Sequence, residues 1–146
     1  MSSSVFPTQT PLNLVMPIKP GAAPLLRALL TGVGSRPDNP VNRALIALSN
    51  VHHAQFVFLE NETRLGVLTW YDGPFEDYIL SFVEHIGGIF NAILQYIDGA
   101  DALIPVELHR DAFTAFIAAH DYKCLHAFSA YPGQRLFDIK DALGLN

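Results

Sequence analysis

The stretch VHHAQFVFLENETRLGVLTWYD, residues 51–72, decides the fold that this sequence predicts. Segments 55–59 and 65–71 are rich in β-branched and aromatic residues, which favour β-strands. The polar segment 60–63 separates them and is typical of a tight turn, in which Asn61 can take the positive φ angle that such turns need. A longer loop is an alternative. We therefore predict a β-hairpin around which the other elements pack.

A two-residue turn at positions 61 and 62 would place His53 opposite Trp70 and His52 opposite Tyr71. One face of the hairpin would then carry His53, Gln55, Val57 and Leu59 with Trp70, Leu68, Gly66 and Arg64, and the other His52, Ala54, Phe56 and Phe58 with Tyr71, Thr69, Val67 and Leu65. A slip of one residue would exchange the partner faces. Because both faces are largely apolar, we expect both to be covered, one by helices and the other by a different element such as a second subunit.

The composition limits the class of protein. The length of 146 residues fits a single domain. The hydrophobic fraction of 50% is high and the charged fraction of 16% is low, which indicates surface that is buried by association. The net charge of −5 argues against nucleic-acid binding, since no basic patch is present to neutralise phosphates. The single cysteine, Cys124, excludes an intrachain disulfide and a cysteine metal cluster.

Residues 1–10 are rich in serine and threonine, and we expect them to form a flexible N-terminus before a single domain over residues 11–146. The first residues lack the basic and apolar regions of a secretory signal. The sequence contains no run of about 18 apolar residues, so no membrane span is expected. We therefore predict a cytoplasmic protein.

Two more strands and several helices are expected outside the hairpin. The strands are expected at 12–18 and 123–131. The helices are expected at 22–30, after the capping residue Asn39, from Phe75 to Ile97, at 106–120 and at 136–143. Gly87 and Gly88 fall in the middle of the longest helix and should weaken or kink it. The helix over 106–120 should turn an inner face toward the core, made of Leu108, Phe113, Phe116 and Ile117.

The order strand, helix, strand, strand, helix, strand predicts an α+β fold. It is a ferredoxin-like βαββαβ four-stranded antiparallel sheet with helices on one face, plus inserted short helices before the second and fourth strands. Such a sheet leaves its other face bare. A symmetric homodimer that packs sheet on sheet would cover that face.

This order of elements, with the segments VHHAQFVFL, TWYDGPFEDYI and FSAYPG, resembles the dimeric α+β barrel superfamily and an uncharacterised bacterial branch of it. In that branch the first segment more often reads His-Phe-Ala-Arg, where this chain has His53 for the Phe and Gln55 for the Arg. The resemblance covers residues 11–140 and implies a homodimer. Superfamily members include heme-dependent peroxidases, heme-degrading oxygenases and cofactor-free monooxygenases, so the resemblance does not select one chemistry.

Histidine is the residue type with the most candidates for chemistry. The six histidines are His52, His53, His85, His109, His120 and His126. Their spacing matches no zinc motif, and the neighbours His52 and His53 point to opposite faces of a strand, so no metal site is predicted. No resident cofactor is predicted either. Heme stays an alternative, although it needs an axial histidine with a polar group opposite, and Arg64 is the only arginine of the hairpin.

Two functions stay open. The first is a small-molecule-binding or structural module that forms a sheet-to-sheet homodimer. The second is an oxygenase or heme-dependent peroxidase-like enzyme with its site in the cavity between sheet and helices. For a small apolar or aromatic ligand we predict a pocket lined by His52, Phe56, Thr69, Tyr71 and Tyr131. His52 and Tyr71 are the catalytic candidates, with His52 transferring a proton and the tyrosine orienting a polar ligand atom. The competing interpretation is that these groups bond one another and close the core. Asp72 is interpreted as a strand end and helix cap.

Overall fold

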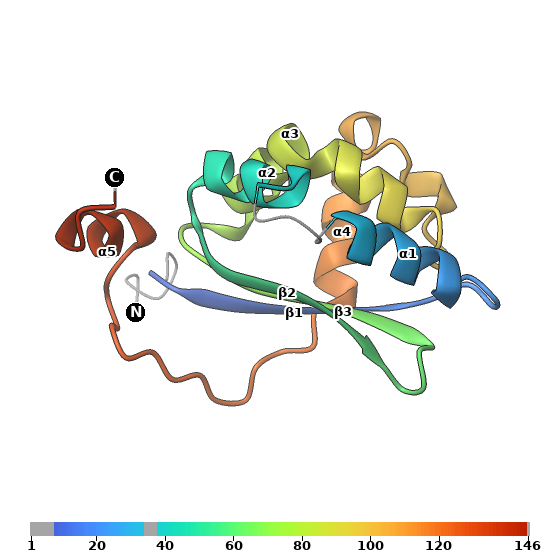
Figure 1. Cartoon of the computed structure of the whole chain (residues 1–146), viewed down its shortest axis with the longest axis horizontal. Coiled ribbons are helices and arrows are strands. Elements are labelled where there is room, and N and C mark those ends of the chain that lie inside the picture. Colours follow the sequence, from blue (N-terminus) through green and yellow to red (C-terminus); the bar gives the residue numbers. More distant parts are fainter. Residues whose placement is uncertain (1–7, 34–37, 146) are drawn as a thin grey trace.

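The computed structural model describes residues 8–33 and 38–145. The fold is α+β, and its centre is a three-stranded antiparallel sheet. The strands are β1 (Thr10–Pro17), β2 (Val51–Leu59) and β3 (Arg64–Tyr71), and their order in the sheet is β1-β3-β2. Figure 1 shows the sheet from its side, with a layer of helices above it.

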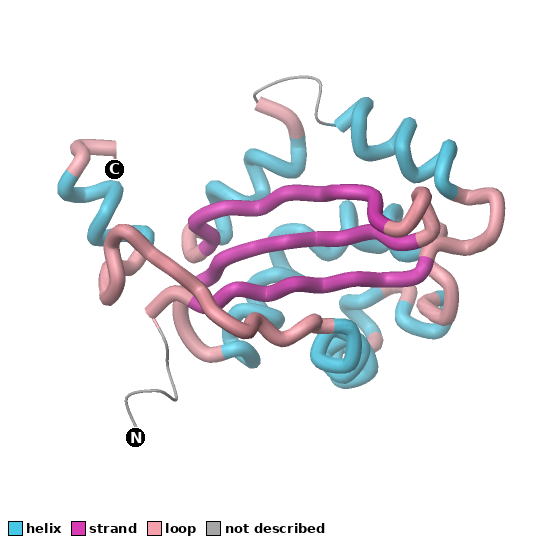
Figure 2. Tube along the Cα trace, turned by 90° about the horizontal axis from the view of Figure 1, so that it is seen from below, coloured by secondary structure: helices cyan, strands magenta, loops and turns pink. Residues whose placement is uncertain are grey.

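The α-helices of the described chain take three positions. α1 (Ala23–Val33), α2 (Pro40–Leu48) and α3 (Phe75–Leu94) lie on one side of the sheet, and α4 (Arg110–His120) stands beside the edge formed by β1 (Figures 1 and 2). α5 (Leu136–Ala142) lies apart from this layer, at one end of the sheet. Two short 3-10 helices, η2 (Asp101–Leu103) and η3 (Val106–Leu108), connect α3 to α4.

The hairpin has the register that the sequence predicts over most of its length. His53 pairs with Trp70, and the pairing continues to Leu59 opposite Arg64. The connection is a four-residue turn, 60–63, rather than a two-residue one. Three of its residues have positive φ, so the turn reverses the chain without a glycine.

The two faces of the sheet differ in how they are covered. The inner face carries the buried side chains of Leu12, Leu14, Met16, Leu65, Val67, Thr69 and Tyr71. The outer face carries Val57, Leu68 and Trp70, which are partly exposed. Figure 2 looks at the outer face from below, and no helix of the described chain crosses it. The predicted division of the hairpin residues between the two faces is confirmed from residue 53 onward.

α3 supplies the largest share of the core. Its buried residues recur every three or four positions: Tyr78, Ile79, Phe82, Val83, Ile86, Gly87, Phe90, Ile93 and Leu94. The helix runs unbroken through Gly87 and Gly88. Gly87 faces η3, where a Cβ atom would lie 3.2 Å from Val106 Cγ2, whereas a Cβ atom on Gly88 would meet nothing within 4 Å. Gly87 therefore serves a close approach between α3 and η3.

The predicted fourth strand, 123–131, is not a strand. After α4 the chain touches the edge of β1 only briefly. Leu14 forms an isolated bridge with Asp121, and Tyr122 N donates a hydrogen bond of 2.8 Å to Asn13 O. The chain then leaves the sheet and runs to α5 as an extended segment (Figure 1). We call residues 122–135 the C-terminal arm.

The ladder stops because of a proline in β1. Asn13 turns its N–H and C=O toward the open edge of the sheet, and residues two positions away do the same. The register set by Asn13 and Tyr122 would place Cys124 opposite Pro11, which has no N–H to donate. A fourth strand therefore cannot extend along this edge with a complete ladder.

The remaining sequence predictions meet mixed outcomes. Asn39 caps α2 as expected, since its Oδ1 accepts a hydrogen bond of 2.8 Å from Asn42 N. The predicted helix over 106–120 is divided into η3 and α4, and Leu108 is 76% exposed instead of facing inward. Of the predicted flexible N-terminus, residues 1–7 lie outside the described residues, and Thr10 already begins β1. Within the described ranges, none of the helices has the length and apolar character needed to cross a bilayer.

Candidate functional site

His52 lies at a β-bulge at the start of β2. Val51, not His52, is opposite Tyr71, and regular pairing resumes with His53 opposite Trp70. The predicted pairing of His52 with Tyr71 is therefore wrong. Two residues of β2 oppose one residue of β3 at this point, which takes His52 out of the regular alternation of side chains.

The carboxylate of Asp72 joins His52 to α5. Asp72 Oδ1 lies 2.7 Å from His52 Nε2, and Asp72 Oδ2 accepts a hydrogen bond of 2.7 Å from Leu136 N. The side chains of His52 and Asp72 are only 7% and 10% exposed. Because an ionised carboxylate can only accept, Nε2 carries the proton in this pair, and Nδ1 of the neutral ring is left as an acceptor. Asp72 thereby fixes both the tautomer and the orientation of His52.

An open hollow of about 340 Å³ lies between α2, the start of β2 and α5. We call it the His52 hollow. Its lining residues are Asn42, Leu45, Ile46, Val51, His52, His53, Ala54, Leu136 and Lys140. Most of these side chains are apolar, and a few polar groups lie among them. This combination and this volume are typical of small-molecule sites.

A second hollow, of about 210 Å³, also borders on His52 and His53. Its other lining residues come from four segments: Gln9, Trp70, Phe128, Ser129, Ala130, Tyr131 and Ile139. Gln9 anchors the C-terminal arm here, since its Nε2 donates to Tyr131 O at 2.9 Å and its Oε1 accepts from Ser129 Oγ at 2.9 Å. Tyr131 therefore reaches the surroundings of His52 through the arm and not through a fourth strand.

The other predicted pocket residues lie elsewhere. Thr69 and Tyr71 are buried on the inner face of the sheet. The ring of Tyr71 stacks on that of Tyr78 with 4.2 Å between centroids. Burial raises the pKa of the Tyr71 phenol. Phe56 lines a third hollow, of about 300 Å³, beside α2. The structure thus brings Tyr131 close to His52 but leaves Thr69, Tyr71 and Phe56 outside the His52 hollow.

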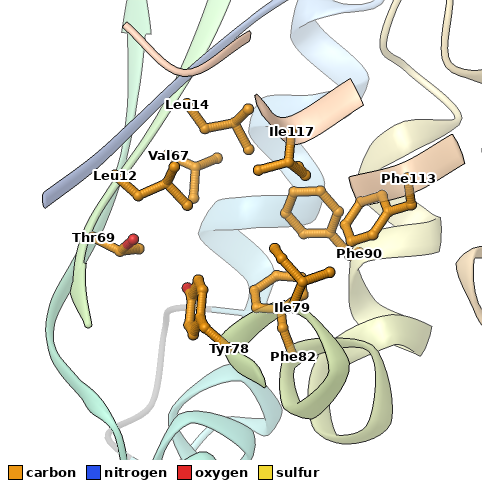
Figure 3. A pocket seen from close by; sticks show the side chains of 10 residues that line it. All are labelled: Leu12, Leu14, Val67, Thr69, Tyr78, Ile79, Phe82, Phe90, Phe113 and Ile117. Atoms are coloured by element: carbon orange, nitrogen blue, oxygen red, sulfur yellow. The ribbon is translucent and has the colours of Figure 1, made fainter. Parts of the chain in front are cut away.

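The space between sheet and helices is almost completely filled. Figure 3 shows the ten residues around the cavity of about 10 Å³ that remains there. Thr69 Oγ1 and the Tyr78 hydroxyl face each other across it, although Thr69 Oγ1 has no hydrogen-bond partner of ordinary geometry. Burial raises the pKa of Tyr78 to about 12. This cavity has room for about one water molecule and not for a heme or a polycyclic substrate.

The remaining histidines have local roles or lie on the surface. Nδ1 of His85 bonds Ser81 O at 3.0 Å, and Nδ1 of His120 bonds Phe116 O at 2.8 Å, each one helical turn away. In the part of the chain that the structure describes, no three His, Cys, Asp or Glu side chains gather in a way that could hold a metal ion. Cys124 is exposed on the C-terminal arm.

Asp72 is the residue that sequence reasoning missed. It does not cap α3, whose N-cap is Pro74 without a side-chain hydrogen bond. A signal was available, because the hairpin register brings the start of β2 beside the end of β3, and Asp72 directly follows β3. The bulge then brings the imidazole of His52 within hydrogen-bond distance of the Asp72 carboxylate.

The arrangement can bind a small molecule against apolar walls and can accept or return a proton at His52 Nδ1. No protein-family model, curated protein or solved structure matches the chain. A function for it therefore has to be argued from this geometry.

Proposed function

We propose that this chain is a ferredoxin-like small-molecule-binding domain whose ligand occupies the His52 hollow. The observation that carries the proposal is the pairing of His52 with Asp72 in the wall of an open hollow of about 340 Å³. Burying the imidazole beside the carboxylate costs free energy, because two polar groups are desolvated together. Such a cost is expected where the imidazole has a function. Asp121 and Tyr122 take the place beside β1 that the last strand of a ferredoxin-like sheet occupies.

The test is an NMR titration of the protein with two small aromatic probes, phenylacetamide and phenylacetate. The expected result is a set of amide shifts confined to α2, the start of β2 and α5. The ring resonances of His52 should move as well. Those of His85, which lies on α3 and bonds Ser81 O, should stay in place. If neither probe moves the resonances around His52, the proposed site does not exist.

We also propose that the domain forms a homodimer through the outer face of its sheet. Partly exposed apolar residues on that face support this assembly, as do the exposed Leu125 and Phe128 of the C-terminal arm. A typical dimer interface buries about 800 Å² on each partner.

Light scattering tests the assembly. The mass in solution should be about twice the chain mass of 16.1 kDa. Leu68→Lys, on the outer face, should shift the protein toward the monomer. Leu108→Lys, on the exposed η3, is the matched control and should leave the dimer intact. A monomer at micromolar concentration, or equal effects of both variants, would contradict this interface.

A second candidate is an enzyme that uses His52 as a general base without a cofactor, and the buried contact with Asp72 favours it. Oxygenases of this kind belong to the superfamily that the sequence resembles. The heme alternative is separated by titration with hemin. We expect weak binding without a defined axial ligand, since the cavity between sheet and helices holds only about 10 Å³. A stoichiometric Soret band that disappears when one histidine is replaced would favour a heme enzyme instead.

A further inference from the structure

The charged side chain that lines the His52 hollow in the described chain is basic. Lys140 enters the lining from α5, and His52 and His53 enter it from β2, while no Asp or Glu of residues 8–33 and 38–145 belongs to it. Asp72 lies behind His52, and both of its oxygens are already used by His52 and Leu136. The chain as a whole carries a net charge of −5, so a cationic hollow is a local departure from its overall charge.

Lys140 is half-buried, and no hydrogen bond or ion pair of its ammonium group occurs within the described ranges. The other two lysines of the chain have acidic partners. Lys19 pairs with Asp101 at 2.7 Å, and Lys123 pairs with Asp121 at 3.1 Å. An ammonium group without a partner at the edge of a partly apolar hollow is well placed to receive an anion from a ligand.

The rest of the lining indicates what kind of anion fits. The walls are apolar, formed by Leu45, Ile46, Val51, Ala54 and Leu136. Among the described residues of the lining there is no arginine to bind a phosphate with two parallel hydrogen bonds, and the N–H of Leu136 at the start of α5 is already donated to Asp72. One lysine with one or two imidazoles matches a single negative charge on an apolar body.

We infer that the His52 hollow binds a small carboxylic acid with an apolar or aromatic tail. The carboxylate lies against Lys140 and His53, and the tail lies against Leu45 and Ile46 of α2. His52, held by Asp72, faces the ligand as a hydrogen-bonding or proton-accepting group. This inference rests on the proposed function, because it names the ligand class of the same site.

The test compares phenylacetate with phenylacetamide, which has the same ring and a neutral head group. Dissociation constants are measured by calorimetry or by NMR titration at low and high salt. The acid should bind at least tenfold more tightly than the amide, since a hydrogen bond to a charged group is stronger than one to a neutral group. Added salt should weaken binding of the acid and leave binding of the amide unchanged.

Two substitutions with the same change of charge locate the effect. Lys140→Met should weaken phenylacetate binding about tenfold and leave phenylacetamide binding unchanged, whereas Lys123→Met, on the C-terminal arm, should change neither. Lys140→Arg should restore the preference for the acid, which excludes a simple loss of folding. Equal affinities of acid and amide, or equal effects of the two Met variants, would overturn the inference while the proposed site stands. Failure of both probes to bind would overturn the site and the inference together.

Discussion

The interior of the domain and the end of the sheet at His52 use similar apolar side chains but are filled to very different degrees. Between the sheet and the helices, ten residues leave a cavity of only about 10 Å³. At the end of the sheet, nine residues from three elements surround an open hollow of about 340 Å³. The first region is a core, and the second has room for a ligand.

The two regions are also held together differently. The interior depends on burial, with Tyr78, Phe90 and Phe113 nearly inaccessible to solvent. α5, which forms one wall of the His52 hollow, has no buried residue and is attached by hydrogen bonds, among them the one from Leu136 N to Asp72. Stability therefore lies mainly between sheet and helices, whereas the wall that α5 forms for the His52 hollow can move at small cost.

The largest effect should come from emptying the interior. Phe90→Ala removes a side chain that is 1% exposed, and we expect it to lower the free energy of unfolding by about 3–5 kcal/mol. Phe137→Ala is the matched control, since that side chain is 61% exposed on α5 and its loss should change the stability by less than about 0.5 kcal/mol. Urea unfolding at a fixed protein concentration measures both. Similar losses in the two variants would contradict the comparison.

The next effect concerns pH. The pKa of Tyr78 is about 12 in the folded chain, against 10.0 for an ordinary tyrosine, because burial disfavours the phenolate. Above pH 10 the unfolded chain therefore loses this proton first, and the stability contributed by the neutral phenol disappears between pH 10 and pH 12. A shift of about two units corresponds to about 2–3 kcal/mol.

Unfolding followed from pH 8 to pH 12 checks this expectation. Tyr78→Phe should show a shallower decline over the same interval, because the ring stays buried without an ionisable group. A decline of the same slope in both proteins would show that another group is responsible. Tyr131, which is 64% exposed, provides a comparison, and Tyr131→Phe should leave the decline unchanged.

A smaller and local effect should follow from Asp72→Ala. This change removes the acceptor of both His52 and Leu136 N, so the free energy of opening α5 should fall by about 1–3 kcal/mol. Hydrogen exchange of the α5 amides measures it. Asp101→Ala is the control, because its ion pair with Lys19 is exposed and contributes little. Unchanged exchange in α5 would mean that other contacts hold this helix.

The smallest effect distinguishes the two sides of α3. Gly88→Ala should stabilise the domain by about 0.5–1 kcal/mol, because alanine favours the helix and its methyl group would point into open space. Gly87→Ala should give a smaller gain or a loss, since its methyl group would press on Val106 and Glu107. Thermal unfolding compares the two. Equal gains would indicate that η3 is not fixed against α3.

The hairpin could be predicted from the sequence because its information is local. The alternation of apolar residues and the polar turn define which residues pair, and the pairing of His53 with Trp70 follows directly. The bulge at His52 could not be predicted, because the extra residue depends on how the strand ends pack and not on periodicity. Gly87 and Gly88 were expected to weaken or kink α3, and the close approach of η3 to Gly87 could not be predicted from the sequence.

The fourth strand and the site show where such reasoning fails. The segment 123–131 has the composition of a strand, but a strand also needs a partner edge with free donors, and Pro11 interrupts that edge. The predicted pocket relied on the fourth strand to bring Tyr131 to Tyr71. Once the segment becomes an arm, Tyr131 reaches His52 from another direction, and Tyr71 stays in the core against Tyr78.

The prolines of β1 also bear on how this protein behaves when it is concentrated. Pro11 and Pro17 both occupy positions that face the open edge, and the N–H of Asn13 between them is already bonded to Asp121. A strand from another molecule would find too few donors there to continue the sheet. Fibrils grow by templating one strand on the next without limit, and this edge cannot act as the template. Any association at this side of the molecule should therefore use side-chain contacts and not the addition of strands to β1.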